Sequence, residues 1–284
     1  MNYSTAIIIV SYHTGEVLFE CLAEVLKRKE KTQIILVDNG NKAQVKAQIK
    51  DLAQLNPQLK YVDAQSNIGF GRACNLGVRH SDCENLVFLN PDAIVQNHAI
   101  DELCSLLDNK PKIIGGLIID ENGSELRGAR RGTMSIWTAL ITFAGRGQSG
   151  VGAGIWRDFN WWREPLPNGP IEVGTISGAF FAIKAKDFSK IGGFDEGYFL
   201  HVEDIDLCHK MHSIGGKVIF NPNAKARHIG ATSNAPRAIV TWHKYAGFMR
   251  FFWKTNNWLG KIVTIIIAPI LFAAIFGRDL IKRK

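Results

Sequence analysis

Apolar, β-branched runs separated by helical patterns fill the first third of the chain, and they constrain its fold most. The first run, Ala6 to Ser11, has no polar alternation, which is typical of a parallel strand covered on both faces. Similar runs follow three times, at Gln33 to Val37, Lys60 to Val62 and Asn85 to Leu89. Helical patterns from Gly15 and over Ala43 to Leu55 separate the first three runs. This alternation predicts a doubly wound α/β sheet.

Polar residues follow these predicted strands. They are Asp38, the segment Asn67 to Asn75 and the segment Asn90 to Asp92. Ligands bind beyond the carboxyl ends of the strands in such a sheet, so these residues are candidates for a site. In the second segment two glycines allow the backbone to approach a ligand, and Arg72 is placed to reach a phosphate. The alternative stays open, because Asp-Asn-Gly and Asn-Pro-Asp are good turns and glycines ease the start of a helix.

A second candidate cluster contains three carboxylates at the start of a predicted helix. If Glu203 opens this helix, Asp204 shares a mostly apolar face with residues one and two turns later and is expected to face inward. Asp206 is expected to form an ordinary surface ion pair with Lys210. Acidic residues in a first turn are also favoured by the helix dipole alone.

A predicted short strand, Lys217 to Phe220, follows this helix and leads to His228. A helix that begins with an inward carboxylate, followed by a strand that returns a histidine, can bring a base and a metal ligand into one cleft. A carboxylate at Asp92, partnered by His228, suits a divalent cation that takes its remaining ligands from water and phosphate oxygens.

Composition limits the class of protein without choosing a function. The chain has 284 residues, 46% of them hydrophobic, which is enough for one large domain with an appendage. Its five cysteines form no Cys-x-x-Cys pair, which argues against a disulfide framework or a zinc site and favours a reducing cytosol. The net charge of +8 suits an anionic partner: nucleic acid, an acidic membrane face or a phosphorylated substrate.

Seven motifs, taken together in this order and spacing, resemble the family 2 inverting nucleotide-sugar glycosyltransferases. Within that family the chain is most similar to bacterial rhamnosyltransferases of O-antigen and cell-wall polysaccharide synthesis, over about residues 5 to 235. The motifs are Val37-Asp38-Asn39, the segment Asn67 to Asn75, Asn90-Pro91-Asp92, Ser177-Gly178-Ala179-Phe180, Gly193-Phe194-Asp195-Glu196, Glu203-Asp204-x-Asp206-Leu207-Cys208 and His228.

The resemblance implies a GT-A fold, a Rossmann-like mixed sheet flanked by helices, with a nucleotide-diphosphate sugar as donor and Mg²⁺ or Mn²⁺ as cofactor. It implies Asp204 as catalytic base, Asp92 and His228 as metal ligands, and Asp38 as a nucleoside contact. The full predicted donor-binding set is Asp38, Asn67, Gly69, Arg72, Asn75, Asn90 and Gly178. The predicted acceptor-binding set is Glu203, Arg130, Arg131 and Trp162.

Some positions depart from the family's pattern. His13 replaces the usual asparagine, Gly40-Asn41-Lys42 replaces the usual Ser-x-Asp, and Lys210 replaces an arginine. Asn90 stands where the metal-binding Asp-x-Asp has its first acid, which lowers the charge of the site. These departures leave open an inactive scaffold that binds a sugar nucleotide.

The region from about 120 to 170 is irregular in sequence. It contains an arginine cluster at Arg127, Arg130 and Arg131, an apolar stretch from Ile136 to Phe143 and several tryptophans, Trp162 among them. A long loop with an interior helix is one interpretation. The other is a flap that faces the acceptor or the membrane, with arginines on a lipid diphosphate and tryptophans at the headgroup level.

The composition changes after about residue 235. A predicted boundary there divides a catalytic domain, 1–235, from C-terminal amphipathic and apolar helices, 236–284. The apolar run Ile262 to Phe276 contains Pro269, has basic flanks and is shorter than the ~20 residues that span a bilayer. A kinked, re-entrant or interfacial helix pair is therefore preferred to a full span, with a packed core helix as the alternative.

The predicted function is inverting, metal-dependent transfer of a sugar, with L-rhamnose from dTDP-rhamnose as the best candidate, to a polyprenyl-diphosphate-linked saccharide. UDP-hexose, UDP-GlcNAc or UDP-galactofuranose are alternative donors. The predicted location is the cytoplasmic face of the plasma membrane, as a peripheral or monotopic protein on an anionic surface. A nucleic-acid partner is not expected, because the basic residues gather near the apolar tail instead of lining an aromatic-studded sheet.

Overall fold

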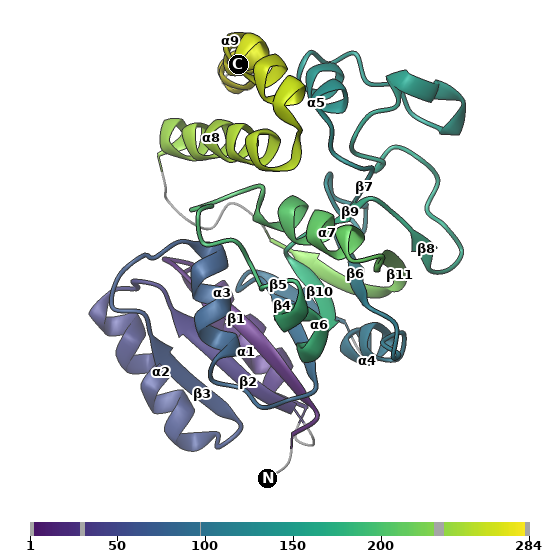
Figure 1. Ribbon diagram of the computed structural model, residues 1–284. Helices are drawn as coiled ribbons and strands as arrows, with labels where there is room; N and C mark the ends of the chain where they lie inside the picture. Colours follow the sequence, from purple (N-terminus) through teal and green to yellow (C-terminus); the bar gives the residue numbers. More distant parts are fainter. Residues whose placement is uncertain (1–2, 29–31, 97, 230–235, 282–284) are drawn as a thin grey trace.

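A mixed sheet forms the centre of the protein (Figure 1). The computed structural model describes residues 3–28, 32–96, 98–229 and 236–281, and within them the sheet has nine strands. The order is β3-β2-β1-β4-β10-β6-β11-β5, with β8 paired to β11. The strands are β1 (Thr5–Ser11), β2 (Thr32–Asp38), β3 (Leu59–Asp63), β4 (Asn85–Leu89), β5 (Ala93–Val95), β6 (Lys112–Ile119), β8 (Ile171–Glu172), β10 (Phe180–Lys184) and β11 (Lys217–His228).

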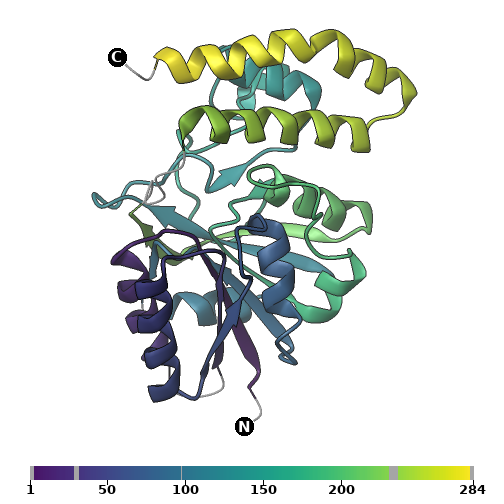
Figure 2. The ribbon, with the colours of Figure 1, turned by 90° about the vertical axis from the view of Figure 1, so that its left-hand side faces the viewer.

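Helices lie on both sides of this sheet (Figures 1 and 2). They are α1 (Val17–Leu26), α2 (Ala43–Leu55), α3 (Phe70–Val78), α4 (Ala99–Cys104), α6 (Ala185–Lys190) and α7 (Glu203–Ser213). Helix α3 packs close to β1 and β2 through Gly77, where a Cβ would lie 2.7 Å from Ile8 Cγ2. The four strands and two helices expected in the first third of the chain are all present, and the sheet fully buries β1.

The sheet is parallel only in part. β1, β2, β3 and β4 run parallel, as expected of a doubly wound sheet, whereas β10 runs antiparallel to both β4 and β6. This mixture, with flanking helices, is the GT-A-like arrangement, and the predicted fold class is confirmed.

Strand β11 is longer than the predicted run. The expected end at Phe220 is wrong: a register shift between Asn221 and Lys225 absorbs the Asn-Pro-Asn segment, and the strand continues to His228. Its last residues pair with β5, so that His228 lies opposite Ala93. A bulge bends the strand without ending it, because pairing resumes on the far side.

The irregular region contains short elements: β7 (Arg130–Arg131), α5 (Ile136–Phe143) and the 3₁₀ helix η1 (Val151–Trp156). β7 pairs with β9 (Thr175–Ile176) in a separate two-stranded sheet. Ser135 caps α5 with its side chain on the backbone of Thr138. The expected interior helix is therefore present, and the segment around it is folded.

Two long helices end the described chain, α8 (Arg237–Thr255) and α9 (Trp258–Ile281). They run side by side across one end of the molecule, next to α5 (Figure 2). Helix α9 is continuous through Pro269, so the apolar segment is longer than the predicted fifteen-residue run. The stretch Trp258–Gly277 has a mean hydropathy of 2.4, is only 22% buried, and is long and apolar enough to cross a membrane. The expected domain boundary near residue 235 lies outside the described residues.

The C-terminal helices enclose a second hydrophobic core, separate from the sheet. It joins residues of the irregular region, including α5, with residues in and just before α7 and residues of α8 and α9. They are Met134, Ala139, Phe159, Tyr198, Val202, Ile205, Phe248, Phe251, Phe252, Ile267, Leu271 and Ile275. The buried residues of α9 are Thr264, Ile267, Leu271 and Ile275, which are three or four residues apart and therefore form one inward stripe.

Candidate active site

A cavity of about 470 Å³ opens at the carboxyl ends of the parallel strands. We call it the strand-end cavity, and it is lined by Val10, Tyr12, His13, Thr14, Asn39, Asn67, Phe70, Asn90, Pro91, Asp92, Phe199, Leu200, Pro236, Ile239, Val240 and His243. Its position is the one that the strand order predicts for a ligand. Of the predicted site residues, it brings together Asn67, Asn90 and Asp92.

Asp92 and His228 meet beside this cavity. His228 Nε2 lies 3.1 Å from Asp92 Oδ1 and 3.3 Å from the side-chain amide of Asn90. Both Asp92 and Asn90 follow β4, and His228 arrives on the far end of β11, so the extension of β11 beyond its bulge creates the cluster. The predicted pairing of Asp92 with His228 is thus present in the structure.

Asn67 organises the turn that enters α3. Its Oδ1 accepts hydrogen bonds from the backbone N–H of Gly69 at 3.1 Å and from Asn39 Nδ2 at 3.0 Å. Gly69 has φ +88°, and a Cβ there would meet Phe199 O at 2.8 Å. Only glycine fits this position, because the backbone is left-handed and the next segment lies against it. The glycine brings the segment around Phe199 close to the strand ends.

Asp38 lies beneath the strand-end cavity and does not line it. The residue is fully buried, and Oδ1 accepts hydrogen bonds from the backbone N–H groups of Gly40 and Asn41. Its Oδ2 accepts one from Tyr61 Oη at 2.8 Å. In this arrangement Asp38 shapes the turn, and its neighbour Asn39 faces the cavity.

Three other predicted donor residues also make contacts within the protein. Arg72 pairs with Glu196, 3.1 Å from Nε to Oε2, on the surface. The Asn75 side chain bonds to both the N–H and the carbonyl of Phe194, and Gly178 N–H donates to Asp204 Oδ2 at 3.1 Å. None of the three lines the strand-end cavity. They hold together the motifs around the site, and their contact with a donor stays a prediction.

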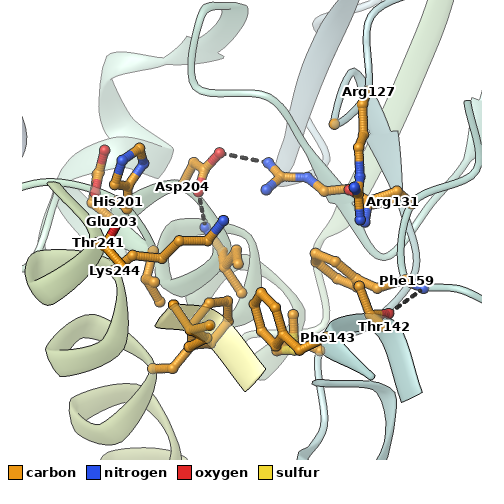
Figure 3. A pocket seen from close by; sticks show the side chains of 17 residues that line it. Arg127, Arg131, Thr142, Phe143, Phe159, His201, Glu203, Asp204, Thr241 and Lys244 are labelled. Atoms are coloured by element: carbon orange, nitrogen blue, oxygen red, sulfur yellow. Dashed lines mark hydrogen bonds and ion pairs between the residues drawn. The ribbon is translucent and has the colours of Figure 1, made fainter. Parts of the chain in front are cut away.

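A second cavity of about 380 Å³ lies at the start of α7 (Figure 3). We call it the helix-lined cavity, and it is bounded by Arg127, Gly128, Arg131, Met134, Thr142, Phe143, Phe159, Asn160, His201, Val202, Glu203, Asp204, Ile205, Thr241, Lys244, Phe248 and Ile275. Consecutive residues of one segment line the two cavities in turn: Phe199 and Leu200 the first, His201 to Ile205 the second. The two cavities therefore share a wall.

Asp204 projects into the helix-lined cavity opposite Arg131 (Figure 3). Arg131 donates a hydrogen bond to Asp204 Oδ2 as an ion pair, and the Arg131 guanidinium also bonds to the Ile176 carbonyl. The Asp204 side chain keeps 17% of its surface exposed. The expected inward orientation is present, and the predicted acceptor residue Arg131 lies beside the predicted base.

Glu203 lies beside Asp204 in a less polar setting. Burial raises the pKa of Glu203 to about 8, and the neighbouring Asp204 carboxylate adds to the rise. Within the described residues its Oε2 accepts no hydrogen bond. Burial also lowers the pKa of His201 to about 4, with the positive charge of Lys244 contributing. At neutral pH both side chains are therefore mainly uncharged.

The turn before α7 has an unusual backbone. His201 and Val202 have φ angles of 68° and 72°, a region that a β-branched residue rarely adopts. Helix α8 packs against this turn through Gly247, where a Cβ would lie 2.9 Å from Val202 Cγ2. Phe199 also stacks on His243 of α8, with ring centroids 4.6 Å apart. Contacts from α8 thus hold the turn that positions Glu203 and Asp204 at the helix-lined cavity.

Asp206 corrects one expectation from the sequence. It is fully buried instead of lying on the surface, and its main partner is Lys254 of α8, at 2.8 and 3.0 Å. Lys210 is a more distant partner at 3.5 Å. Lys254 also binds Asp195 at 2.8 Å, so one lysine links α8 to two of the sequence motifs. The helical period alone cannot place this partner, because α8 lies far along the chain.

Two predicted acceptor residues lie outside the helix-lined cavity. Arg130 is buried, pairs with Glu125, and donates to the carbonyls of Glu164 and Pro165. Trp162 is exposed on the irregular segment, with Arg163 over its ring. Adjacent residues of a strand point to opposite faces, so the placement of Arg131 at the cavity directs Arg130 away from it.

Several lining residues were not among the predicted site residues. Asn39 follows the predicted strand-end residue Asp38 directly, so its position was the available signal. Thr241, Lys244 and Phe248 reach the helix-lined cavity from α8, three and four residues apart. Their helical spacing was readable, but nothing in the sequence said which element this face of α8 would meet.

The mixed sheet and its flanking helices give the protein a GT-A-like fold, and the family comparison places it among the glycosyltransferases. The chain belongs to glycosyl transferase family 2, whose model matches residues 6–192. The predicted family is thereby confirmed.

Curated relatives extend the similarity over most of the chain. The N-acetylglucosaminyl-diphospho-decaprenol L-rhamnosyltransferase of Mycobacterium tuberculosis (strain H37Rv) is 25% identical over 89% of this chain and 85% of its own length. The rhamnosyltransferase WbbL of Escherichia coli (strain K12) is 24% identical over 85% of this chain and 90% of its own.

A solved structure supports the fold independently. GalNAc-T7 with UDP, GalNAc and Mn²⁺ superposes with a TM-score of 0.63 at 16% identity, over 88% of this chain. The chain spans about half of that protein, 47% of its length. At this identity the similarity concerns the fold alone.

Proposed function

We propose that this glycosyltransferase moves a sugar, with inversion, from a nucleotide-diphosphate donor to a hydroxyl group of a lipid-linked saccharide. The observation that carries the proposal is the pair of cavities that share one wall, with the Asp92–His228 pair in reach of one and the Asp204 carboxylate in the other. A donor in the strand-end cavity and an acceptor in the helix-lined cavity can then meet at the segment Phe199 to Glu203.

The proposed donor is dTDP-L-rhamnose, and the proposed acceptor is a polyprenyl-diphosphate saccharide. Support comes from the two relatives, both named as rhamnosyltransferases, one of them for an N-acetylglucosaminyl-diphospho-decaprenol substrate. UDP-hexose, UDP-GlcNAc and UDP-galactofuranose remain the alternative donors, because no described residue identifies the base or the sugar.

The residues near the strand-end cavity fit a divalent cation such as Mg²⁺ or Mn²⁺. Asp92 offers a carboxylate and His228 an imidazole 3.1 Å away, with the amide of Asn90 beside them. Within the described residues no group of three or more His, Cys, Asp and Glu side chains is arranged to hold a metal ion. Two such ligands suit an ion that shares its coordination with a diphosphate. When bound, the ion would supply charge stabilisation for the departing diphosphate.

Asp204 is the residue that we assign to take the proton from the acceptor hydroxyl. Its Oδ2 is held by Arg131 and by Gly178 N–H, and its Oδ1 accepts one bond from Ile205 N–H at 2.8 Å. A carboxylate oxygen has two lone pairs, so Oδ1 can still accept the substrate proton. A positioned general base of this kind contributes about 10²–10⁴-fold to the rate.

We also propose that the outer face of α9 attaches the enzyme to the cytoplasmic face of an anionic membrane. Large apolar side chains are exposed along this face, with Trp258 at 68%, Ile266 at 65% and Ile270 at 57% exposure. The inner stripe of α9 packs in the second core, which favours a helix lying on the membrane. Flotation with anionic vesicles tests this attachment, and a full-length protein that stays in the soluble fraction at low salt would exclude it.

The experiment that tests the function is transfer of labelled sugar to an N-acetylglucosaminyl-diphospho-polyprenol by the purified full-length protein. Each nucleotide sugar is supplied in turn, and the anomeric configuration of the extracted product is read by NMR. Rhamnose transfer with inversion is the expected result. Binding of a nucleotide sugar without any transfer would instead identify the chain as an inactive scaffold.

A further inference from the structure

The C-terminal helices form one wall of the helix-lined cavity (Figure 3). Thr241, Lys244 and Phe248 of α8 face it. Ile275 of α9, a member of the second hydrophobic core, also lines it. Their spacing along α8 places the three residues on one helix face. The cavity is therefore incomplete without the C-terminal pair of helices, although the residues predicted from the motifs all precede them.

Lys244 extends into this cavity from the wall opposite Arg127 and Arg131 (Figure 3). Its ammonium group lies 5.4 Å from the centre of the Phe143 ring. A lysine of this kind packs its aliphatic stem along apolar surface and presents its charge at the end. The charge of Lys244 is thus carried into the cavity by a helix that no motif marks.

The rest of the lining combines cations with apolar side chains. Arg127 and Arg131 supply two further positive charges, and the apolar part comes from Met134, Phe143, Phe159, Phe248 and Ile275. Asp204 is paired with Arg131, and Glu203 is mainly protonated at neutral pH because burial raises its pKa to about 8. A lining of this composition favours an anion that carries an apolar chain.

We propose that Lys244 binds the diphosphate of the lipid-linked acceptor, while Phe143 and Phe248 contact the first isoprene units. The proposal rests on the proposed function and deepens it, because it makes the C-terminal helices part of the acceptor site and not only a membrane attachment.

Helix α9 places the helix-lined cavity close to the proposed membrane surface. Its inner stripe, from Thr264 to Ile275, ends at the cavity, and its outer face exposes Ile266 and Ile270. A membrane at the outer face of α9 would therefore be separated from this end of the cavity by the thickness of one helix, about 10 Å.

The test compares full-length wild type with Lys244→Met, which keeps an unbranched apolar side chain and removes the charge. Geranyl diphosphate, geraniol and UDP are the probes, and tryptophan fluorescence reports binding. We expect Lys244→Met to weaken geranyl diphosphate binding about tenfold or more, as for loss of a charge-assisted hydrogen bond. Binding of geraniol and of UDP should stay within about twofold, which is well below that change.

Two further variants control for folding and for total charge. Lys244→Arg keeps the charge and should retain most of the binding, whereas Lys190→Met removes an exposed lysine of α6 and should leave all three probes unaffected. Equal loss of geranyl diphosphate and UDP would assign Lys244 to the donor diphosphate and overturn the proposal. So would a wild type that binds geraniol as well as geranyl diphosphate.

Failure of the proposed function has a different signature. If the wild type transfers no sugar but binds geranyl diphosphate through Lys244, the proposed function is wrong and the lipid site stands. If the wild type transfers sugar and Lys244→Met has the same acceptor KM as the wild type, the proposed function stands and the lipid site is wrong.

Discussion

The strand-end cavity and the helix-lined cavity are built in different ways. Strands β1 to β4 place Asn39, Asn67, Asn90 and Asp92 at one edge of a sheet whose core is mainly aliphatic. The helix-lined cavity is assembled from α5, the turn before α7, α8 and α9, around a core that includes Phe159, Phe248, Phe251 and Phe252. The polar side of the first depends on strand order, although Ile239, Val240 and His243 of α8 also line it. The second depends on packing between distant parts of the chain.

This difference suggests a division of labour between the two substrates. A sheet edge is a rigid support that suits a nucleotide diphosphate, the part that many donors have in common. A cavity enclosed by helices that also carry an exposed apolar face suits an acceptor held at a membrane. The predictions below test whether donor and acceptor functions separate along this line.

The largest effect is expected at Asp204. Asp204→Asn should lower kcat by about 10²–10⁴-fold, because the amide cannot take the acceptor proton. Donor binding should change by less than a few-fold, since the side chain lies in the other cavity. Steady-state transfer and titration with the nucleotide sugar measure the two quantities. Asp51→Asn, on the exposed face of α2, is the matched control, and near-normal transfer by Asp204→Asn would contradict the assignment of Asp204 as the base.

The next effect concerns the metal. EDTA should stop transfer by the wild type, and Mg²⁺ or Mn²⁺ should restore it, whereas Asp92→Ala should lose about 100-fold in kcat/KM and resist rescue. Substitution of His228 by alanine is expected to lower transfer and to resist metal rescue in the same way, because the side chains of His228 and Asp92 lie 3.1 Å apart. Unchanged transfer by metal-free enzyme would remove both residues from this role.

A smaller effect is expected at Glu203. Its pKa in the folded protein is about 8, against 4.5 for an ordinary glutamate, so folding favours the protonated form. The folded state then binds more protons than the unfolded state between these values, and stability falls as pH rises through this window. The side chain of Glu203→Gln does not titrate, so the variant does not lose stability in this way as the pH rises. Its Tm should match that of the wild type near pH 4.5 and exceed it by about 2 °C or more near pH 8.

Scanning calorimetry across pH measures this gap. Glu121→Gln, at an exposed turn, serves as its control and should show no such trend. A constant difference between Glu203→Gln and wild type from pH 5 to pH 8 would show that Glu203 is ionised in the folded protein and would add a negative charge to the lining of the helix-lined cavity.

The sequence predicted the strand-end region better than the helix-lined region, for a physical reason. Strands β1 and β4 and helix α2 are set by local patterns, so the placement of Asn90 and Asp92 at a strand end follows from the amino-acid sequence alone. The partner of Asp206 does not, because Lys254 lies 48 residues away and approaches only when α8 packs on α7.

The arginine pair shows the same limit at shorter range. Arg130 and Arg131 looked equivalent in the sequence, but β7 directs one to Glu125 and the other to Asp204. Likewise, the sequence placed Asp38 at the end of a strand. It did not show that the carboxylate oxygens accept hydrogen bonds from Tyr61 and from the backbone of the turn that follows. A pattern gives position along an element, and tertiary packing decides the partner.

Hydrogen exchange of the full-length protein with and without a nucleoside diphosphate tests the separation of the two cavities most directly. We expect slower exchange in peptides that cover residues 10–14, 38–41, 65–70 and 90–95, with little change in α5 and in the inner stripe of α9. An acceptor analogue such as geranyl diphosphate should give the reverse pattern. Protection by the nucleoside diphosphate confined to α5 and α9, with the strand ends unchanged, would contradict the assignment of the donor to the sheet edge.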